Sequence, residues 1–225
     1  YRELLERNDL LATSPLSTVA NSLQVAAVAT LISVTVGTVA SLVVVHGARW
    51  HANLLDAGLM VPLGTSAVTL GFGLFLAFDS DPLAWRTSWW ILPIAHALVG
   101  IPFVIRSVVP VLRSLDEQVR DAARTLGASP MRVLRSVDLP VAGRGMAVGA
   151  AFAFAVSMGE FGATSVLPRD RDDMTAPIAI FRLLGTPGDA IRTQAFALSV
   201  VVLVVVAVAV SAIDRLRPPG GGGGW

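Results

Sequence analysis

The residues of this 225-residue chain that could do chemistry are few and widely spaced. Glu160 stands out because it is the only charged residue within the apolar stretch 145–167. An ionised side chain in the centre of a membrane costs about 2.5–3.5 kcal/mol on insertion scales, so an acid there indicates a functional site by default. The alternatives are an internal pair with an arginine and a helix end capped by water.

The three histidines lack the spacing of a metal site. His46 and His51 lie at the end of one apolar stretch. His96 lies alone within another, where hydrogen-bonded packing is the expected role. Serine, aspartate and histidine residues show no arrangement typical of a nucleophile. We therefore expect neither a metal site nor a catalytic residue.

The composition excludes further kinds of chemistry. The chain has no cysteine, which excludes disulfides, zinc–thiolate sites, iron–sulfur clusters and thiol nucleophiles. All 17 basic residues are arginine, and a chain without lysine cannot form a Walker A loop, whose lysine reaches the nucleotide phosphates. Any ATP and Mg²⁺ would be bound by a partner. The net charge of +1 gives no reason to expect nucleic-acid binding.

The elements that must position these residues have the character of transmembrane helices. Hydrophobic residues make up 54% of the chain and charged residues 15%, against about 25% charged residues in soluble domains. Five stretches reach the length of about 20 apolar residues that crosses a bilayer. They are 18–45, 57–78, 87–105, 145–167 and 193–213. One such stretch could be a buried helix of a soluble protein, but five predict an all-α, polytopic membrane helix bundle.

The placement of arginine predicts the orientation of the bundle. The densest basic segment links the third and fourth spans, so we place it in the cytoplasm. It contains Arg113, Arg120, Arg124, Arg132, Arg135 and Arg144. Alternation then puts the N-terminus outside and the C-terminus in the cytoplasm. Residues 1–14 become an extracytoplasmic lead-in, and residues 216–225 a flexible tail of proline and glycine.

The linker 114–140 has the pattern of two short helices. Ser114 and Glu117 are typical of a capping box, and Asp116 and Arg120 of an ion pair four residues apart. Helical spacing places a set of apolar residues on one face of the first helix. These residues are Val119, Ala122, Ala123 and Leu126.

The turn between the two helices is also marked in the sequence. Gly127 is placed to end the first helix in a left-handed conformation, and Ser129-Pro130 to start the second. We expect Leu139-Pro140 to break the second helix. Such an apolar face suits a groove on another protein. The alternative is an amphipathic loop that lies on lipid headgroups.

This linker resembles the EAA signature of permease subunits of binding-protein-dependent ABC importers. Asp121-Ala122-Ala123 is followed by Gly127 at the family's spacing, and then by Val137-Asp138-Leu139-Pro140. The family pattern has glutamate at the position of Asp121 and isoleucine at that of Val137, and both changes are chemically mild. The resemblance extends over residues 15–215. It implies the MetI-like permease fold, with about five core transmembrane helices and a cytoplasmic two-helix coupling loop.

The resemblance implies a division of labour between subunits. The loop 114–140 would dock on a dimer of cytoplasmic ATPase subunits, with Asp121 against the ATPase and Gly127 forming the turn. Ala122 and Ala123 would permit close docking, and Val137, Leu139 and Pro140 complete the expected coupling residues. The chain itself would not be an enzyme. An extracytoplasmic binding protein would deliver the substrate, and a second permease module, as a homodimer or a fused half, would complete the path in a bacterial plasma (inner) membrane.

The segment around Glu160 resembles particular groups within this family. Gly159-Glu160-Phe161-Gly162-Ala163-Thr164 is similar to a segment of iron(III)-, thiamine- and molybdate/sulfate-type permeases. The segment 175–184 is similar to the outer loop of the iron(III) and thiamine groups. We therefore expect Gly159, Glu160 and Gly162 to line the translocation path and iron(III) to be the substrate. Thiamine or an oxyanion such as molybdate or sulfate is the alternative, since the binding protein largely sets specificity in such systems.

Two other classes of function fit the sequence less well. An intramembrane enzyme would need paired acids, histidine ligands or an activated serine at membrane depth, where only Glu160 qualifies. A passive channel or structural bundle would leave the loop 114–140 without a purpose. The start at Tyr1, with the charged segment 2–7 before the first span, is expected of a portion of a longer polypeptide.

Overall fold

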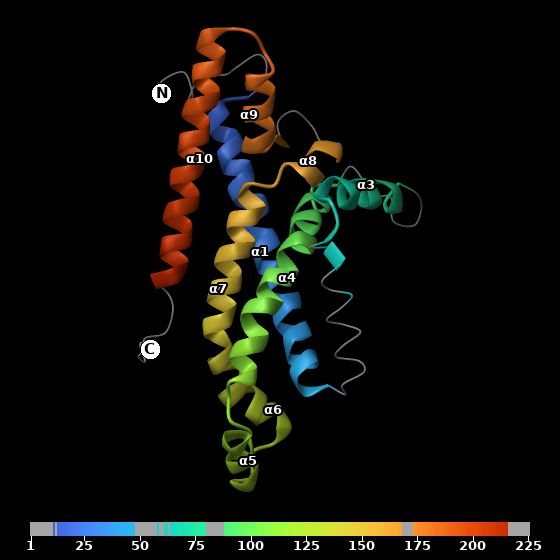
Figure 1. Cartoon of the computed structure of the whole chain (residues 1–225), viewed down its shortest axis with the longest axis vertical. Helices are drawn as coiled ribbons and strands as arrows, with labels where there is room; N and C mark the ends of the chain where they lie inside the picture. Colours follow the sequence, from blue (N-terminus) through green and yellow to red (C-terminus); the bar gives the residue numbers. More distant parts are fainter. Residues whose placement is uncertain are drawn as a thin grey trace.

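A computed structural model of the chain describes residues 11, 13–47, 58, 61–62, 64–79, 88–167 and 173–215. These described residues form α-helices and one π-helical turn, and no β-strand. The long helices lie beside one another along the long axis of the molecule, and short helices lie at both of its ends (Figure 1). The predicted all-α fold class is confirmed.

The described ranges contain ten helical elements. In chain order they are α1 (Pro15–His46), α3 (Ala67–Ala77), α4 (Ile91–Arg113), α5 (Glu117–Thr125), α6 (Pro130–Val133), the π-helical turn η2 (Leu134–Asp138), α7 (Leu139–Met158), α8 (Gly162–Val166), α9 (Ala176–Leu184) and α10 (Asp189–Arg215).

Four helical stretches in the described part of the chain are long and apolar enough to cross a membrane. They are Pro15–His46, Ile91–Arg113, Pro130–Val166 and Asp189–Ile213. The first and last contain the predicted spans 18–45 and 193–213. The predicted span 87–105 corresponds to α4, which continues to Arg113 with Pro102 and Pro110 inside it. A proline has no backbone N–H, so each of these prolines removes one hydrogen bond from the helix. Packing against the neighbouring helices keeps α4 helical through both positions.

Two predicted spans differ from the structure. Within 57–78 the described helix α3 is 11 residues long, too short for a bilayer crossing, and residues 57, 59, 60 and 63 lie outside the described residues. The predicted fourth span, 145–167, starts too late, whereas its end lies one residue beyond the apolar helical stretch Pro130–Val166, which has a break between α7 and α8. Helix already runs from Pro130, and α7 ends at Met158. The tail 216–225 and most of the lead-in 1–14 also lie outside the described residues.

Helix α4 lies at the centre of the bundle, where it packs against α1 and α7 (Figure 1). Glycines bring the backbones of α7 and α4 together: a Cβ added to Gly145 would lie 2.6 Å from the carbonyl oxygen of Ser107, and one added to Gly149 would lie 2.7 Å from the Cα of Val104. In lipid, close backbone approach of this kind holds helices together. The surrounding buried cluster comprises Val104, Val108, Leu112, Ala142 and Ala153.

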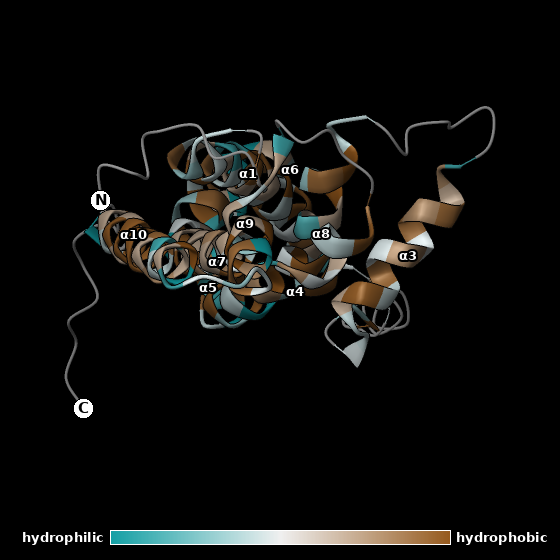
Figure 2. Ribbon diagram, turned by 90° about the horizontal axis from the view of Figure 1, so that it is seen from above, coloured by the Kyte–Doolittle hydropathy of each residue, from teal (hydrophilic) through white to brown (hydrophobic). Residues whose placement is uncertain are grey.

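Helices α10 and α3 lie on the flanks of the bundle. From above they are on opposite sides, and apolar residues colour much of both (Figure 2). On α10, Leu203 is 68% exposed and Phe196 59% exposed, although the helix packs against α7 and α9 along its other side. Outward apolar surfaces suit contact with lipid or with a second subunit.

The linker between α4 and α7 lies at the opposite end of the molecule from the start of α1. Helices α5 and α6 lie at one end, and α9 and the start of α10 lie at the other (Figure 1). Helices α1, α4 and α10 therefore run toward the linker end of the molecule, and α7 runs back from it (Figure 1).

Candidate coupling surface and translocation path

The first helix of the linker, α5, is capped by Asp116. This residue has extended backbone, and its carboxylate accepts a hydrogen bond from the backbone N–H of Gln118 at 3.0 Å. The predicted capping box of Ser114 and Glu117 is wrong. Ser114 still has helical backbone at the end of α4, and its hydroxyl donates to the Val111 carbonyl oxygen. An N-cap needs extended backbone, which places the cap at Asp116.

The turn between α5 and α6 has the predicted form. Gly127 has φ +83°, in the left-handed region that favours glycine. The N–H of Ala128 donates to the Ala123 carbonyl oxygen at 3.0 Å, as in a Schellman motif. Ser129 then has extended backbone at the N-cap of α6, and Pro130 occupies its first turn.

Exposed apolar side chains extend across α5, the turn and α6. Val119 is 46% exposed, Leu126 88% and Met131 54%, and Ala122 is exposed beside them. We call these four residues the docking surface. An apolar surface at the polar end of a membrane bundle has the character of a protein contact. Its position on α5 agrees with the face predicted from helical spacing.

The other predicted coupling residues lie around this surface. Asp121 is exposed, and its Oδ1 accepts a hydrogen bond from Nη1 of Arg124 at 2.7 Å. Further along the linker, Ala123, Val137 and Leu139 are half-buried and Pro140 is exposed. Asp121 therefore stands next to the docking surface, with room for a partner.

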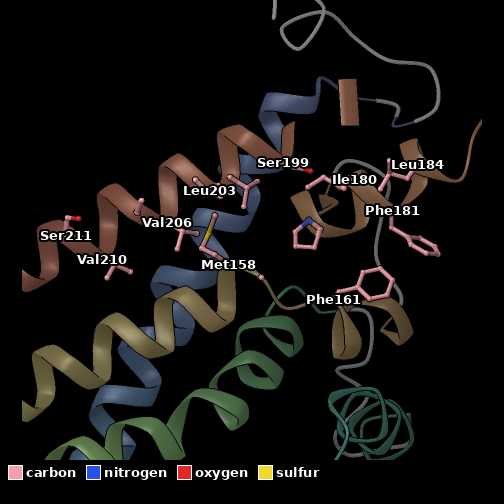
Figure 3. A pocket seen from close by; sticks show the side chains of 14 residues that line it. Met158, Phe161, Ile180, Phe181, Leu184, Ser199, Leu203, Val206, Val210 and Ser211 are labelled. Atoms are coloured by element: carbon pink, nitrogen blue, oxygen red, sulfur yellow. The ribbon is translucent and has the colours of Figure 1, made fainter. Parts of the chain in front are cut away.

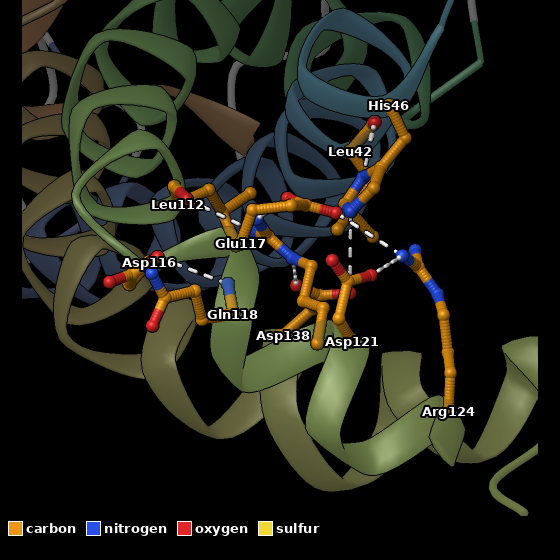
Figure 4. Close-up of polar contacts among 10 residues, drawn as sticks. Leu42, His46, Leu112, Asp116, Glu117, Gln118, Asp121, Arg124 and Asp138 are labelled. Carbon is orange, nitrogen blue, oxygen red and sulfur yellow. Dashed lines mark hydrogen bonds and ion pairs between the residues drawn. The ribbon is translucent and has the colours of Figure 1, made fainter.

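Arg120 turns into the protein, and its ion-pair partners are Glu117 and Asp138 in place of the predicted Asp116. Its side chain is 4% exposed. Nε donates to Oδ1 of Asp138 at 2.8 Å, Nη1 to Oε2 of Glu117 at 2.8 Å and Nη2 to the Leu112 carbonyl oxygen at 3.1 Å (Figure 4). The guanidinium thus uses all three of its nitrogens, on groups from three different elements.

Asp138 is the centre of this cluster. Its side chain is 4% exposed, and its second oxygen, Oδ2, lies 3.4 Å from Nε2 of His46, the last residue of α1. Nδ1 of His46 donates to the Leu42 carbonyl oxygen at 3.0 Å (Figure 4). The cluster therefore joins the ends of α1 and α4 to α5 and η2.

The charges of the cluster reinforce one another. Burial by itself lowers the pKa of Arg120, but hydrogen bonds to Asp138 and Glu117 outweigh burial and raise that pKa above its ordinary value. The hydrogen bond from Arg120 lowers the pKa of Glu117, with a smaller contribution from Arg124. The guanidinium and the Glu117 carboxylate are therefore both charged at neutral pH.

The helix continues through Leu139 and Pro140, contrary to the predicted break. The turn η2 is π-helical, with the N–H of Leu139 donating to the Leu134 carbonyl oxygen. Pro140 lies in the first turn of α7. A proline has no N–H to satisfy, and a wider turn before it relieves its contact with the preceding carbonyl groups. The linker is thus joined to α7 by continuous helix.

Glu160 lies at the break between α7 and α8. It is 9% exposed, and its Oε1 accepts a hydrogen bond from the backbone N–H of Ala163 at 2.9 Å. Gly159 forms the end of α7, and Gly162 packs close to the start of α3, where an added Cβ would lie 3.0 Å from the Cβ of Ala67. Glu160 therefore binds a backbone N–H at the start of α8, an interaction that differs from both predicted alternatives, an arginine pair and a helix end capped by water.

His96 bridges the two sides of the same break. It is 2% exposed, with Nδ1 2.8 Å from Oγ of Ser157 on α7 and Nε2 2.7 Å from Oγ1 of Thr164 on α8. The Thr164 hydroxyl lies within 3.2 Å of the Glu160 carbonyl oxygen as well. The expected role of His96 in hydrogen-bonded packing is confirmed. Among the described residues, no group of three His, Cys, Asp or Glu side chains is placed to hold a metal ion.

A groove of about 870 Å³ opens beside the break, between α9, α10 and the end of α7 (Figure 3). Met158, Gly159 and Phe161 line it from one side, and Phe181 and Leu203 from the other. The rings of Phe161 and Phe181 lie 5.0 Å apart at its edge. The groove is apolar, so it offers packing to lipid or protein and no charge of its own for a polar solute.

Comparisons with known proteins identify the family. Residues 29–218 match the family of binding-protein-dependent transport system inner membrane components. The chain belongs to this family. The match spans most of the described bundle, from α1 to the end of α10, and includes the whole linker.

Relatives in this family are permeases of ABC importers. The molybdenum transport system permease protein ModB of Escherichia coli (strain K12) is 29% identical over 203 residues, which cover 84% of this chain and 89% of ModB. The putative 2-aminoethylphosphonate transport system permease protein PhnV of Salmonella paratyphi A is 30% identical, over 84% of this chain and 74% of PhnV. The sulfate transport system permease protein CysT of Salmonella typhimurium is 36% identical, over 49% of this chain and 42% of CysT.

A solved structure has the same fold. It is the crystal structure of an amino acid ABC transporter with histidines, which aligns with a TM-score of 0.61, covers 90% of each chain and is 16% identical. The chain is thus a MetI-like, multi-pass membrane protein of the permease family. The iron(III) and thiamine subgroup expected from the sequence is not confirmed, since the relatives described above are named for molybdenum, 2-aminoethylphosphonate and sulfate transport.

Sequence reasoning missed the buried cluster around Asp138. The charge of Asp138 falls between Val137 and Leu139, in a motif otherwise known by its apolar positions. Opposite charges on both sides of the Gly127 turn, at Arg120 and Asp138, were the available signal. Helical spacing alone does not show that α5 lies against the end of α4, where Arg120 finds the Leu112 carbonyl oxygen.

Proposed function

We propose that this chain is the permease subunit of an ABC importer, which forms the substrate path and is driven by separate cytoplasmic ATPase subunits. The observation that carries the proposal is the exposed docking surface on two short helices at one end of an apolar bundle of this family. ATP and Mg²⁺ would be held by the partner, which agrees with the absence of lysine from the chain.

Docking of an ATPase subunit would use the docking surface together with Asp121. Leu126 is the most exposed apolar side chain of this set and lies directly before the turn at Gly127. Burial of such a side chain at the centre of a contact dominates binding energy. Ala122 and Ala123 leave space for close approach, and Asp121 supplies a charge that can reorient from Arg124 to an arginine on the ATPase.

The orientation that follows is an extracytoplasmic N-terminus and a cytoplasmic C-terminus in the bacterial inner membrane. The docking surface must face the cytoplasm, where ATP is available, and the start of α1 lies at the other end of the bundle (Figure 1). An extracytoplasmic binding protein would then meet the end formed by α9 and the start of α10. A second permease module, identical or fused, would complete the path.

The substrate class that we propose is a small oxyanion. Support comes from the relatives, whose names record molybdenum, sulfate and 2-aminoethylphosphonate transport. Iron(III), the first expectation from the sequence, and thiamine are the competing substrates. Glu160, with Gly159 and Gly162, lies at the break in the fourth transmembrane segment and stays our candidate for the path lining.

Docking is tested by co-purification of the cognate ATPase subunit with a Leu126→Asp variant. We expect the variant to insert normally and to bind the ATPase about tenfold more weakly or worse, because a charge replaces a central apolar contact. The matched control is Arg192→Glu, an exposed charge change at the opposite end of the bundle. Wild-type binding by Leu126→Asp would overturn the docking assignment.

Substrate class is tested by uptake into vesicles that contain the permease with its ATPase and binding protein. Radiolabelled molybdate, sulfate, 2-aminoethylphosphonate, iron(III) and thiamine are compared at equal concentration. We expect ATP-dependent accumulation of one of the first three. Accumulation of iron(III) or thiamine alone would contradict the oxyanion proposal and leave the permease assignment standing.

A further inference from the structure

We propose that Arg120 and Asp138 form a rigid joint that fixes the docking loop to the ends of the transmembrane helices, and that both are positioning residues for energy coupling. This inference rests on the proposed function, because it assigns the route by which movement of a docked ATPase reaches the bundle. It concerns two buried residues outside the docking surface.

The attachment of α5 to the rest of the protein is unusual. Arg120 is the only buried residue of this helix, and the helix packs mainly on α6. The apolar side chains of α5 face outward, where they form the docking surface. Helix α5, on which a moving ATPase subunit would act, is therefore held to the bundle by a charged side chain. It has no apolar core of its own.

The contacts of this side chain reach the elements that must move. Arg120 donates to the carbonyl oxygen of Leu112 in the last turns of α4 and to the carboxylate of Asp138 in η2, which runs directly into α7. Asp138 in turn faces His46 at the end of α1 at 3.4 Å. One guanidinium and one carboxylate thus connect α5 with three transmembrane helices.

The chemistry of the Arg120–Asp138 ion pair favours one fixed geometry between α5 and the transmembrane helices. A guanidinium presents its donors in a fixed planar fork, and ion-paired hydrogen bonds away from water are short and directional. Apolar contacts hold helices together with less preference for one geometry. Arg124 on the same helix provides the contrast: it is 51% exposed, and in the described part of the chain its ion pairs, with Glu117 and Asp121, stay within α5.

The test uses variants that remove the joint without leaving a buried charge. Loss of one partner alone, in Arg120→Met or Asp138→Leu, leaves an unpaired ion, and we expect both variants to insert poorly. In the double variant Arg120→Met/Asp138→Leu the pair is replaced by apolar groups, which restores insertion. The control is Arg113→Met, an exposed arginine at the end of α4.

The joint itself is read from the distance between two spin labels. The chain has no cysteine, so labels at Gln118→Cys on α5 and Leu31→Cys on α1 are unique. Distances are measured by pulsed electron paramagnetic resonance in assemblies with the ATPase and one labelled permease chain, with and without a non-hydrolysable ATP analogue. We expect a narrow distribution in the wild type and the control, and a broad one in the double variant.

The second measurement is uptake of radiolabelled molybdate per ATP hydrolysed, with ATPase binding determined in parallel. In the double variant we expect binding at the wild-type level and a fall in uptake per ATP of about tenfold. A purely structural pair would reduce the amount of folded protein and leave this ratio unchanged. A narrow distribution with wild-type coupling in the double variant overturns the joint alone, whereas a wild-type permease that binds no ATPase overturns the proposed function.

Discussion

Glu160 has a structural role at the break before α8 and is also our candidate for the translocation path. One carboxylate oxygen holds the N–H of Ala163, which would otherwise be an unsatisfied donor at the break before α8. An amide oxygen can make the same hydrogen bond, but it carries no charge. The structural and the electrostatic roles of this residue can therefore be separated by substitution.

We expect Glu160→Gln to keep the thermal stability of the wild type, because the hydrogen bond to Ala163 survives. Glu160→Leu removes the acceptor and is expected to cost about 1–3 kcal/mol, as for a buried donor left unpaired. Thermal unfolding in detergent measures both. If the charge lies in the path, uptake of the transported solute falls in both variants. Normal uptake by Glu160→Gln would take the charge out of the mechanism.

Some of these residues could be assigned from the sequence because their roles are local. The left-handed turn at Gly127 follows from the spacing of neighbouring residues, and the packing role of His96 from its isolation in an apolar stretch. The roles of Arg120 and Asp138 depend on which groups from α1 and α4 lie nearby. Those contacts arise from tertiary packing, which spacing along one helix does not contain.

At the scale of elements, the approach of α7 to α4 is set by residue size. An added side chain at Gly149 meets the backbone of Val104, and backbone cannot move aside as the end of a flexible side chain can. Gly143, two turns earlier on the same helix, has open space around it. The two positions therefore form a matched pair on one helix.

We expect Gly149→Val to destabilise the bundle by about 1–3 kcal/mol through overpacking. Gly143→Val should change stability little, because its side chain meets no neighbour. Both substitutions replace glycine by valine within one helix, so the change in helix propensity is the same. The difference in stability between the two variants therefore measures the contact with α4. The measurement is thermal unfolding in detergent, and equal melting temperatures would contradict the close packing of α7 on α4.

The ends of the helices were harder to predict from the sequence than their presence. Apolar composition located α1 and α10 well, since each is bounded by a change in composition. The predicted third span ends at residue 105, although the helix continues to Arg113. Pro140 was read as a break because a proline normally ends an α-helix, and the π-helical turn that accommodates it has no clear sequence signal.

At the scale of the whole molecule, the orientation in the membrane makes a direct prediction. Single cysteines at Gln118 in α5 and at Ala190 at the start of α10 should lie on opposite sides, since these exposed residues are at opposite ends of the bundle (Figure 1). A membrane-impermeant maleimide applied to right-side-out vesicles should label only Ala190→Cys, and inverted vesicles only Gln118→Cys. The reverse pattern would contradict a cytoplasmic docking loop.

The fold of the whole molecule was accessible to sequence reasoning, whereas the substrate was not. Hydrophobic length and the motif around Asp121 and Gly127 are physical requirements of the membrane and of docking. Near the break between α7 and α8, the polar groups among the described residues include Glu160 and the hydroxyl groups that contact His96. Such groups are compatible with several solutes.

The π-helical turn η2 has a geometric consequence for the linker. Helix from Pro130 to Met158 acts as one continuous rod, but η2 carries one surplus residue in its wider turn. One residue corresponds to about 100° of rotation about a helix axis and about 1.5 Å along it. The extra residue therefore rotates the side chains of α6 about the helix axis relative to those of α7 and changes the length of the helix very little. This offset therefore fixes the direction in which α6 presents Met131 relative to α7.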